Sequence, residues 1–131
     1  MDSKKEIKAW REVKKSKKFL NAFRGLYVFW KTTQNLYIHL FASLLVIVLG
    51  FYFNVTSIEW ALLVFSVGLV IIAEAFNTAI EIDIDLTSPE YHPFARDTKD
   101  VAAGAVLLSV LVSVIVGGII FLPKILLYVN I

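Results

Sequence analysis

Two long apolar runs limit what this chain can fold into. Residues 36–53 and 101–122 contain no Lys, Arg, Asp or Glu, so each can cross the hydrocarbon core of a membrane, about 30 Å thick, as a single helix. A third apolar run, residues 60–73, is long enough only if its helix continues through the polar residues that follow. The sequence therefore predicts one all-helical, membrane-embedded domain over residues 1–131. The predicted transmembrane helices are residues 35–53, 58–82 and 99–122.

The basic residues are concentrated at one end of the chain. Ten of the thirteen Lys and Arg lie before residue 35, and none lies between residues 32 and 95. Apolar and aromatic side chains recur among them at helical spacing, which predicts that residues 1–34 form a basic amphipathic helix on the surface of an anionic leaflet. Because basic residues favour the inner side, we expect the N-terminus and a loop at 83–98 to be cytoplasmic. The C-terminus is then expected on the outside.

The middle span carries a stripe of polar side chains. Glu74, Asn77, Glu81 and Asp85 follow one another at offsets of 0, 3, 7 and 11 residues, which places them on one face of a helix. With a rise of about 1.5 Å per residue, Glu81 lies about 10 Å nearer the cytoplasm than Glu74. An ionised group near the middle of a bilayer costs roughly 2.5–3.5 kcal/mol, so such a stripe indicates an ion pathway or a catalytic site.

The residue types along this stripe suit phosphoryl transfer. Glu81 and Asp85, nearer the water, are suitable ligands for Mg²⁺, which prefers a few carboxylates together with phosphate oxygens and water. Glu74 is less solvated and can accept a proton from a hydroxyl held at headgroup depth. Asn77 lies one helical turn away and can orient either group.

The next segment adds cations close to these acids. Arg96 and Lys99 can compensate phosphate charge, and Asp100 begins the third span. Together these residues predict phosphoryl transfer from a nucleotide to a membrane alcohol, a reaction in which catalysis is mostly positioning and charge neutralisation.

Several other chemistries are excluded by composition. The chain has no cysteine and only two histidines, which excludes disulfides, thiolate catalysis and Cys/His metal sites. It has no P-loop and no GxGxxG motif, so metal and side chains must hold any nucleotide. We interpret His92 and Pro93 as a loop-shaping pair, and His39 as an interface residue rather than a proton relay.

Two other functions fit a small membrane protein with buried acids. A proton or ion transporter would carry charge near the middle of several spans, whereas here the charges gather at the cytoplasmic ends. An accessory protein without catalysis would pair its polar stripe only with other protein groups.

The stretch AEAFNTAIEIDIDLTSPEYHPFARDTKDVAAGAVLL, residues 73–108, resembles the signature region of the prokaryotic diacylglycerol kinase family, which includes undecaprenol kinases. The resemblance implies a homotrimer with shared active sites in the inner or plasma membrane of a bacterium, and no nucleic-acid partner. It also implies MgATP as phosphoryl donor and a lipid alcohol, diacylglycerol or undecaprenol, as acceptor. By resemblance, Glu74 is the catalytic base, Asn77 and Glu81 are the polar and metal-binding pair, and the residues on the nucleotide side are Asp85, Lys99 and Asp100.

One position departs from the family pattern. The family usually has a Glu just before the first span, in a motif like KTERN, but here residues 31–35 read KTTQN and Thr33 stands in its place. Three alternatives follow. Water and phosphate complete the Mg²⁺ shell, or Asp83, Glu6 or Glu12 substitutes, or metal affinity and activity are reduced.

Overall fold

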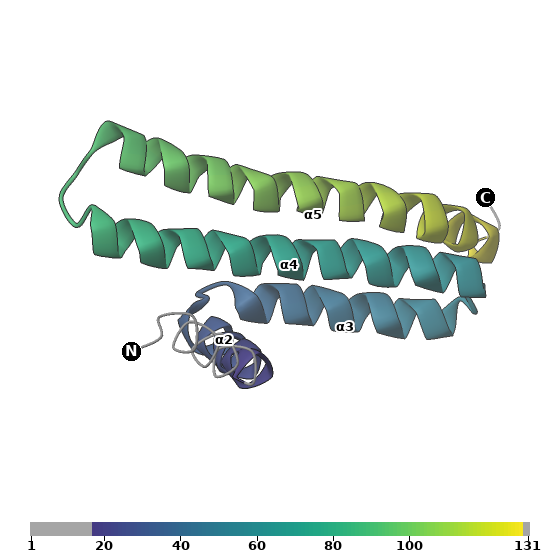
Figure 1. The fold of residues 1–131 in the computed structure, drawn as a ribbon. Coiled ribbons are helices and arrows are strands. Elements are labelled where there is room, and N and C mark those ends of the chain that lie inside the picture. The colour runs from purple at the N-terminus through teal and green to yellow at the C-terminus, as the bar shows by residue number, and fades with distance from the viewer. Residues whose placement is uncertain (1–16, 130–131) are drawn as a thin grey trace, which may run out of the picture. The chain divides into compact units, whose positions relative to one another are not determined.

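The computed structural model describes residues 17–129 and is all-helical, as predicted. The four helices within these residues are α2 (Lys18–Thr32), α3 (Leu36–Tyr52), α4 (Ser57–Thr87) and α5 (Pro93–Tyr128). Figure 1 shows them along the chain. The part of the predicted surface helix that falls on residues 1–16 lies outside the described residues.

Helix α2 belongs to a unit of its own, separate from residues 33–129. Its large apolar and aromatic side chains are exposed, which suits a helix that contacts lipid through one face. These side chains are Phe19, Leu20, Phe23, Leu26, Tyr27 and Trp30. The predicted surface helix extends to residue 34, whereas α2 ends at Thr32 and the next three residues are not helical.

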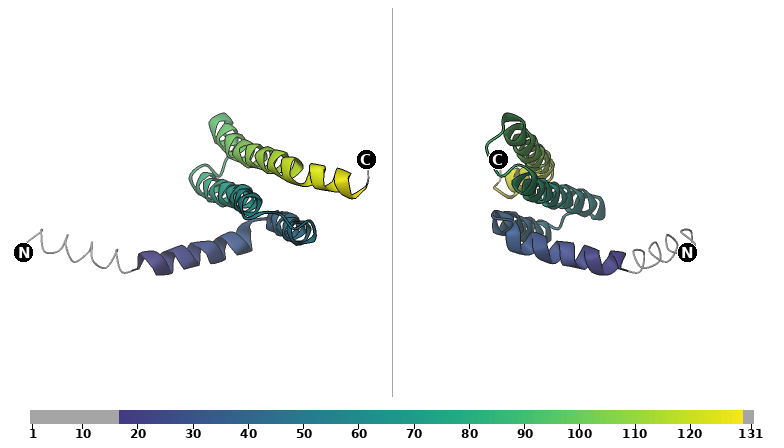
Figure 2. Two further views of the ribbon diagram at one scale, coloured as in Figure 1. Left: turned by 90° about the vertical axis from the view of Figure 1, so that its right-hand side faces the viewer. Right: turned by 60° about the vertical axis from the view of Figure 1, so that its left-hand side comes forward.

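Helices α3, α4 and α5 form the second unit, called here the three-helix unit (residues 33–129). Helix α4 packs along α5 and, less extensively, along α3, so that it lies between the two (Figures 1 and 2). The connections are short, so consecutive helices run in opposite directions. The end of α4 and the start of α5 therefore lie at the same end of the unit as the start of α3.

Capping residues explain where α4 and α5 begin. Helix α4 starts with a capping box, in which the Thr56 hydroxyl accepts a hydrogen bond from the Glu59 N–H and the Glu59 carboxylate accepts one from the Thr56 N–H. At the start of α5, His92 Nδ1 accepts a hydrogen bond from the Phe94 N–H at 3.2 Å, and Pro93 occupies the first turn. The predicted loop-shaping role of His92 and Pro93 is confirmed.

The loop between α4 and α5 is shorter than predicted. We expected a loop at residues 83–98, but α4 continues to Thr87 and α5 begins at Pro93, leaving residues 88–92. The prediction was wrong because it ended the helices where the apolar residues end, and backbone hydrogen bonding continues past that point. As a result, Asp85, Arg96 and Lys99 are helical residues with fixed relative directions.

Helices α4 and α5 are each long and apolar enough to cross a membrane. Helix α3 has 17 residues, the lower end of the roughly 17–25 residues that spanning requires. The three-span arrangement therefore stays a prediction.

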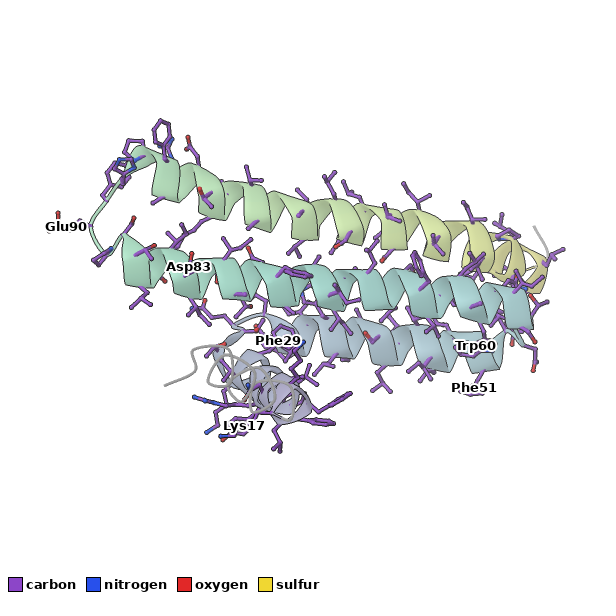
Figure 3. All side chains as sticks on the ribbon, viewed as in Figure 1. Lys17, Phe29, Phe51, Trp60, Asp83 and Glu90 are labelled. Atoms are coloured by element: carbon purple, nitrogen blue, oxygen red, sulfur yellow. The ribbon has the colours of Figure 1, made fainter. Side chains whose placement is uncertain are left out.

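The apolar core of the three-helix unit lies at the end opposite the polar residues. Val55, Leu63, Ile120 and Phe121 are buried there, and Lys124 pairs with Glu59 at 3.1 Å. Trp60 packs so closely on α3 that a side chain at Gly50 would overlap its ring. Figure 3 shows Trp60 at this end of the unit and Glu90 at the other.

Candidate active site

Polar side chains from three segments line one cavity, called here the polar cavity, with a volume of about 260 Å³. The segment before α3 contributes Thr33, Gln34 and Asn35; α4 contributes Glu74, Asn77, Thr78, Glu81 and Asp85; and α5 contributes Lys99. The structure thus places the whole predicted stripe of α4 on one cavity, because the helix continues unbroken to Thr87.

Burial differs along the stripe. Glu74 and Asn77 are 7% and 8% exposed, whereas Glu81 and Asp85 are exposed. A buried carboxylate loses its water and needs a polar partner, while an exposed carboxylate stays hydrated and available to ligands. The acids of α4 therefore differ in their surroundings in the order that their depth on the helix predicts.

A hydrogen bond joins the side chains of Asn77 and Glu81. Asn77 Nδ2 donates a hydrogen bond to Glu81 Oε1 at 3.1 Å, and the buried Asn77 Oδ1 has no hydrogen-bond partner among residues 17–129. An amide oxygen buried without a partner is rare and calls for a ligand. Carboxylate and amide oxygens are suitable ligands for Mg²⁺.

The described part of the chain holds no group of three or more Asp, Glu or His side chains placed to enclose a metal ion. The pair formed by Asn77 and Glu81 still fits Mg²⁺, because this ion usually keeps water and substrate phosphate oxygens in its shell. The site suits a metal that arrives together with a phosphate ligand.

Lys99 spans the cavity from α5 to α4, where Nζ donates to Asp85 Oδ1. Asp85 is largely exposed, and an exposed ion pair contributes little to stability. The Lys99 ammonium can therefore exchange this carboxylate for a phosphate at small cost.

Arg96 and Asp100, which the sequence analysis assigned to the nucleotide, do not line the polar cavity. Arg96 instead donates to Asp97 Oδ1 at 2.7 Å and to the Tyr91 hydroxyl at 3.3 Å. Asp100 is exposed. The reason is that these residues lie on a helix, where Lys99 and its neighbour Asp100 point about 100° apart.

Thr33 faces the polar cavity, and its hydroxyl lies 2.9 Å from the Thr78 hydroxyl. Asp83, one of the proposed substitutes for the missing Glu, lies on α4 (Figure 3). It is exposed and lines neither this cavity nor the one described next. Glu6 and Glu12 lie outside the described residues. All three alternatives for Thr33 therefore stay open, the second of them through Glu6 or Glu12.

A second cavity adjoins the polar one and is called here the mixed cavity, with a volume of about 430 Å³. Glu74, Asn77 and Glu81 line one side. The apolar wall is formed by Ile38 of α3 and by Ala103, Val106, Leu107 and Val110 of α5. A cavity of this kind suits a ligand that has a polar end and an apolar chain.

Sequence reasoning missed four polar residues of these cavities: Gln34, Asn35, His39 and Thr78. His39 is the most informative of them, because its Nε2 lies 3.9 Å from Glu74 Oε2. A signal was present in the sequence, since His39 is the one ionisable side chain other than tyrosine in the run 36–53. Its pairing with Glu74 depends on the register between α3 and α4, which the sequence does not state.

Comparison with known proteins identifies relatives of this chain. A family profile described as prokaryotic diacylglycerol kinase matches residues 20–121. The chain is 39% identical over 108 residues to the undecaprenol kinase of Bacillus subtilis, covering 82% of this chain and 88% of that protein.

Two diacylglycerol kinases are matched over less of their length. The protein from Synechocystis is 40% identical over 109 residues, covering 82% of this chain and 62% of that protein. The protein from Escherichia coli K12 is 40% identical over 74 residues, covering 56% of this chain and 61% of that protein. The profile match covers most of the chain and includes every residue of the polar and mixed cavities, so this chain belongs to the prokaryotic diacylglycerol kinase family.

Proposed function

We propose that this protein is a lipid kinase that transfers the γ-phosphoryl group of ATP to the hydroxyl of a membrane lipid, at the cytoplasmic face of a bacterial membrane. One observation carries the proposal. One cavity is lined by a buried carboxylate, by a second carboxylate, by a lysine and by an amide oxygen that has no partner within residues 17–129. The relatives of the chain are named undecaprenol kinase and diacylglycerol kinase.

Glu74 is the proposed base. The lipid hydroxyl oxygen attacks the γ-phosphorus, the bond from that phosphorus to the bridging oxygen of ADP breaks, and Glu74 takes the hydroxyl proton. Its position on both cavities supports this role, because it lies between the polar wall and the apolar wall of α5. A lipid alcohol needs both kinds of surroundings at once.

Asn77 and Glu81 are the proposed ligands of Mg²⁺, through Asn77 Oδ1 and the Glu81 carboxylate. When bound, the ion neutralises charge on the phosphates of ATP. The hydrogen bond holds the two side chains together, and Asn77 Oδ1 has no partner of its own among the described residues.

Lys99 and Asp85 form the proposed nucleotide side of the cavity. Lys99 would leave Asp85 to contact phosphate, a change that replaces one exposed ion pair with another. Arg96 lies about one turn from Lys99 on α5, so we propose that it and Asp100 contact the outer part of the nucleotide. For Arg96 this requires release from Asp97.

We further propose that the protein acts as a homotrimer with shared active sites. Support comes from the large apolar side chains that are exposed along α3, α4 and α5, and from a polar stripe that three helices alone cover incompletely. Membrane lipids and neighbouring subunits would cover these surfaces.

Diacylglycerol and undecaprenol are the two candidate acceptors, because each carries a hydroxyl on long apolar chains. The test is transfer of radiolabelled phosphate from ATP to each lipid by the purified protein in mixed micelles. We expect labelled lipid from at least one of the two, and only when Mg²⁺ is present. Proton or ion flux across liposomes that contain the protein, without any labelled lipid in the micelle assay, would instead support the transporter alternative.

A further inference from the structure

The carboxylate of Glu74 lacks a hydrogen-bond donor in the described part of the chain. Its side chain is 9% exposed, and the basic group within 4.0 Å is His39 Nε2, which lies 3.9 Å from Oε2. Its oxygens keep access to the cavities, and a carboxylate that meets so little water is stabilised by a nearby donor. A base in this position also needs a fixed orientation, since proton transfer depends on geometry before acidity.

His39 is well placed to supply that orientation. It lies on the first turn of α3, where it lines the mixed cavity together with Glu74 and also borders an apolar cavity of about 250 Å³ between the three helices. The side chain is 16% exposed, and the Ser43 hydroxyl donates to the His39 carbonyl oxygen at 2.6 Å. The imidazole thus lies at the boundary between polar and apolar surroundings.

The distance of 3.9 Å is longer than a direct hydrogen bond, which ends near 3.2 Å. A small side-chain rotation or a bridging water closes this gap, and catalytic hydrogen bonds commonly shorten when substrate binds. With Nε2–H bound to one carboxylate oxygen, the other oxygen is left for the lipid hydroxyl.

We propose that His39 is a positioning residue, which holds the Glu74 carboxylate toward the acceptor hydroxyl through Nε2–H. This inference rests on the proposed kinase function. The positioning role explains why an imidazole lies in the run 36–53, which is otherwise free of acidic and basic groups. A leucine at this position would cost less to bury.

The test compares four variants of the full-length protein in mixed micelles. His39→Leu removes the donor, and His39→Gln places an amide N–H near the position of Nε2. His39→Asn places its amide near Nδ1 instead, so it is matched to Gln in polarity. The control is Tyr37→Leu, the same change from ring to leucine at an exposed position of α3 that lines neither the polar nor the mixed cavity.

We expect His39→Leu and His39→Asn to lower kcat on the order of tenfold to a hundredfold, a part of the 10²–10⁴ that a general base contributes. KM for ATP and for lipid should change by less than about twofold, because the proposed hydrogen bond acts on Glu74 and not on either substrate. His39→Gln should restore most of the lost kcat, and Tyr37→Leu should match the wild type.

A double variant tests whether His39 acts through Glu74. In a Glu74→Asp background the carboxylate is withdrawn by one methylene, so His39→Leu should cause little further loss. A fully additive loss would contradict the proposal.

Other results would also overturn it. An unchanged kcat in His39→Leu would exclude the positioning role of His39. So would an equal loss of kcat in His39→Gln and His39→Asn, or a raised KM for lipid with an unchanged kcat. If His39→Leu does not fold, the comparison of Gln with Asn decides alone. These results leave the kinase assignment intact, whereas a wild type that labels no lipid would remove both proposals.

Discussion

At the scale of single residues, two glutamates seven positions apart on α4 have different surroundings. Glu74 is buried between α3 and α5, and Glu81 is exposed and bonded to Asn77. A buried acid exchanges protons with a substrate held beside it, and an exposed acid binds a hydrated cation. These surroundings support the proposal that Glu74 is the base and Glu81 a metal ligand.

Replacing Glu81 tests the metal assignment. Glu81→Ala should raise the Mg²⁺ concentration for half-maximal activity by at least about tenfold, because it removes the one charged ligand proposed for the ion. The matched control is Asp83→Ala, an acid two residues along that lines neither the polar nor the mixed cavity. Identical Mg²⁺ titrations of Glu81→Ala and the wild type would reject this ligand.

A substitution at Thr33 should strengthen Mg²⁺ binding, whereas Glu81→Ala should weaken it. Its hydroxyl faces the polar cavity beside Thr78, so Thr33→Glu adds a carboxylate close to Asn77 and Glu81. We expect the half-maximal Mg²⁺ concentration to fall by about tenfold, which corresponds to about 1.4 kcal/mol. Thr33→Gln, of similar size but neutral, should not reproduce the fall. An unchanged or weaker Mg²⁺ response in Thr33→Glu would show that the position lies too far from the ion.

At the scale of helices, the sequence predicted the polar face of α4 better than it predicted the helix ends. The offsets of 3, 7 and 11 residues along α4 were enough to place four polar residues together, because a helix has a fixed period. The ends of α4 and α5 could not be predicted from apolar runs, since capping at His92 and backbone hydrogen bonding determine them. Arg96 and Asp100 do not line the polar cavity, so their contact with the nucleotide stays a proposal.

The capping box of α4 should stabilise the fold without contributing to catalysis. Thr56→Ala removes the hydroxyl that accepts from the Glu59 N–H, at the end of the unit opposite Glu81. We expect the free energy of unfolding to fall by about 1 kcal/mol, measured by denaturant titration in detergent, with kcat unchanged. Thr87→Ala, an exposed threonine at the other end of α4, should have a smaller effect. Equal stability of Thr56→Ala and the wild type would show that the cap contributes nothing.

At the scale of the whole molecule, the pairing of His39 with Glu74 could not be predicted from the sequence, because it depends on how α3 and α4 are aligned. The subunit number and the side of the membrane that the site faces are likewise inferred from resemblance and charge bias. Neither the subunit number nor the orientation follows from which side chains are buried within one chain.

The absence of cysteine makes orientation directly measurable, because a single introduced thiol has no competitor. Glu90→Cys places a thiol in the loop beside the site, and Val129→Cys places one just after the end of α5, at the opposite end of the unit. In intact cells, an impermeant thiol reagent should label the Val129→Cys variant and leave the Glu90→Cys variant unlabelled until the membrane is permeabilised. Labelling of the Glu90→Cys variant in intact cells would place the site outside and contradict access to cytoplasmic ATP.

The most direct test of the central claim is the Glu74→Gln variant, which keeps the shape of the side chain and removes its ability to accept a proton. Phosphoryl transfer to lipid and nucleotide-dependent thermal stabilisation are measured on the same detergent-purified sample. The account predicts that transfer falls by at least about a hundredfold while nucleotide still stabilises the protein. Wild-type turnover in Glu74→Gln would contradict it.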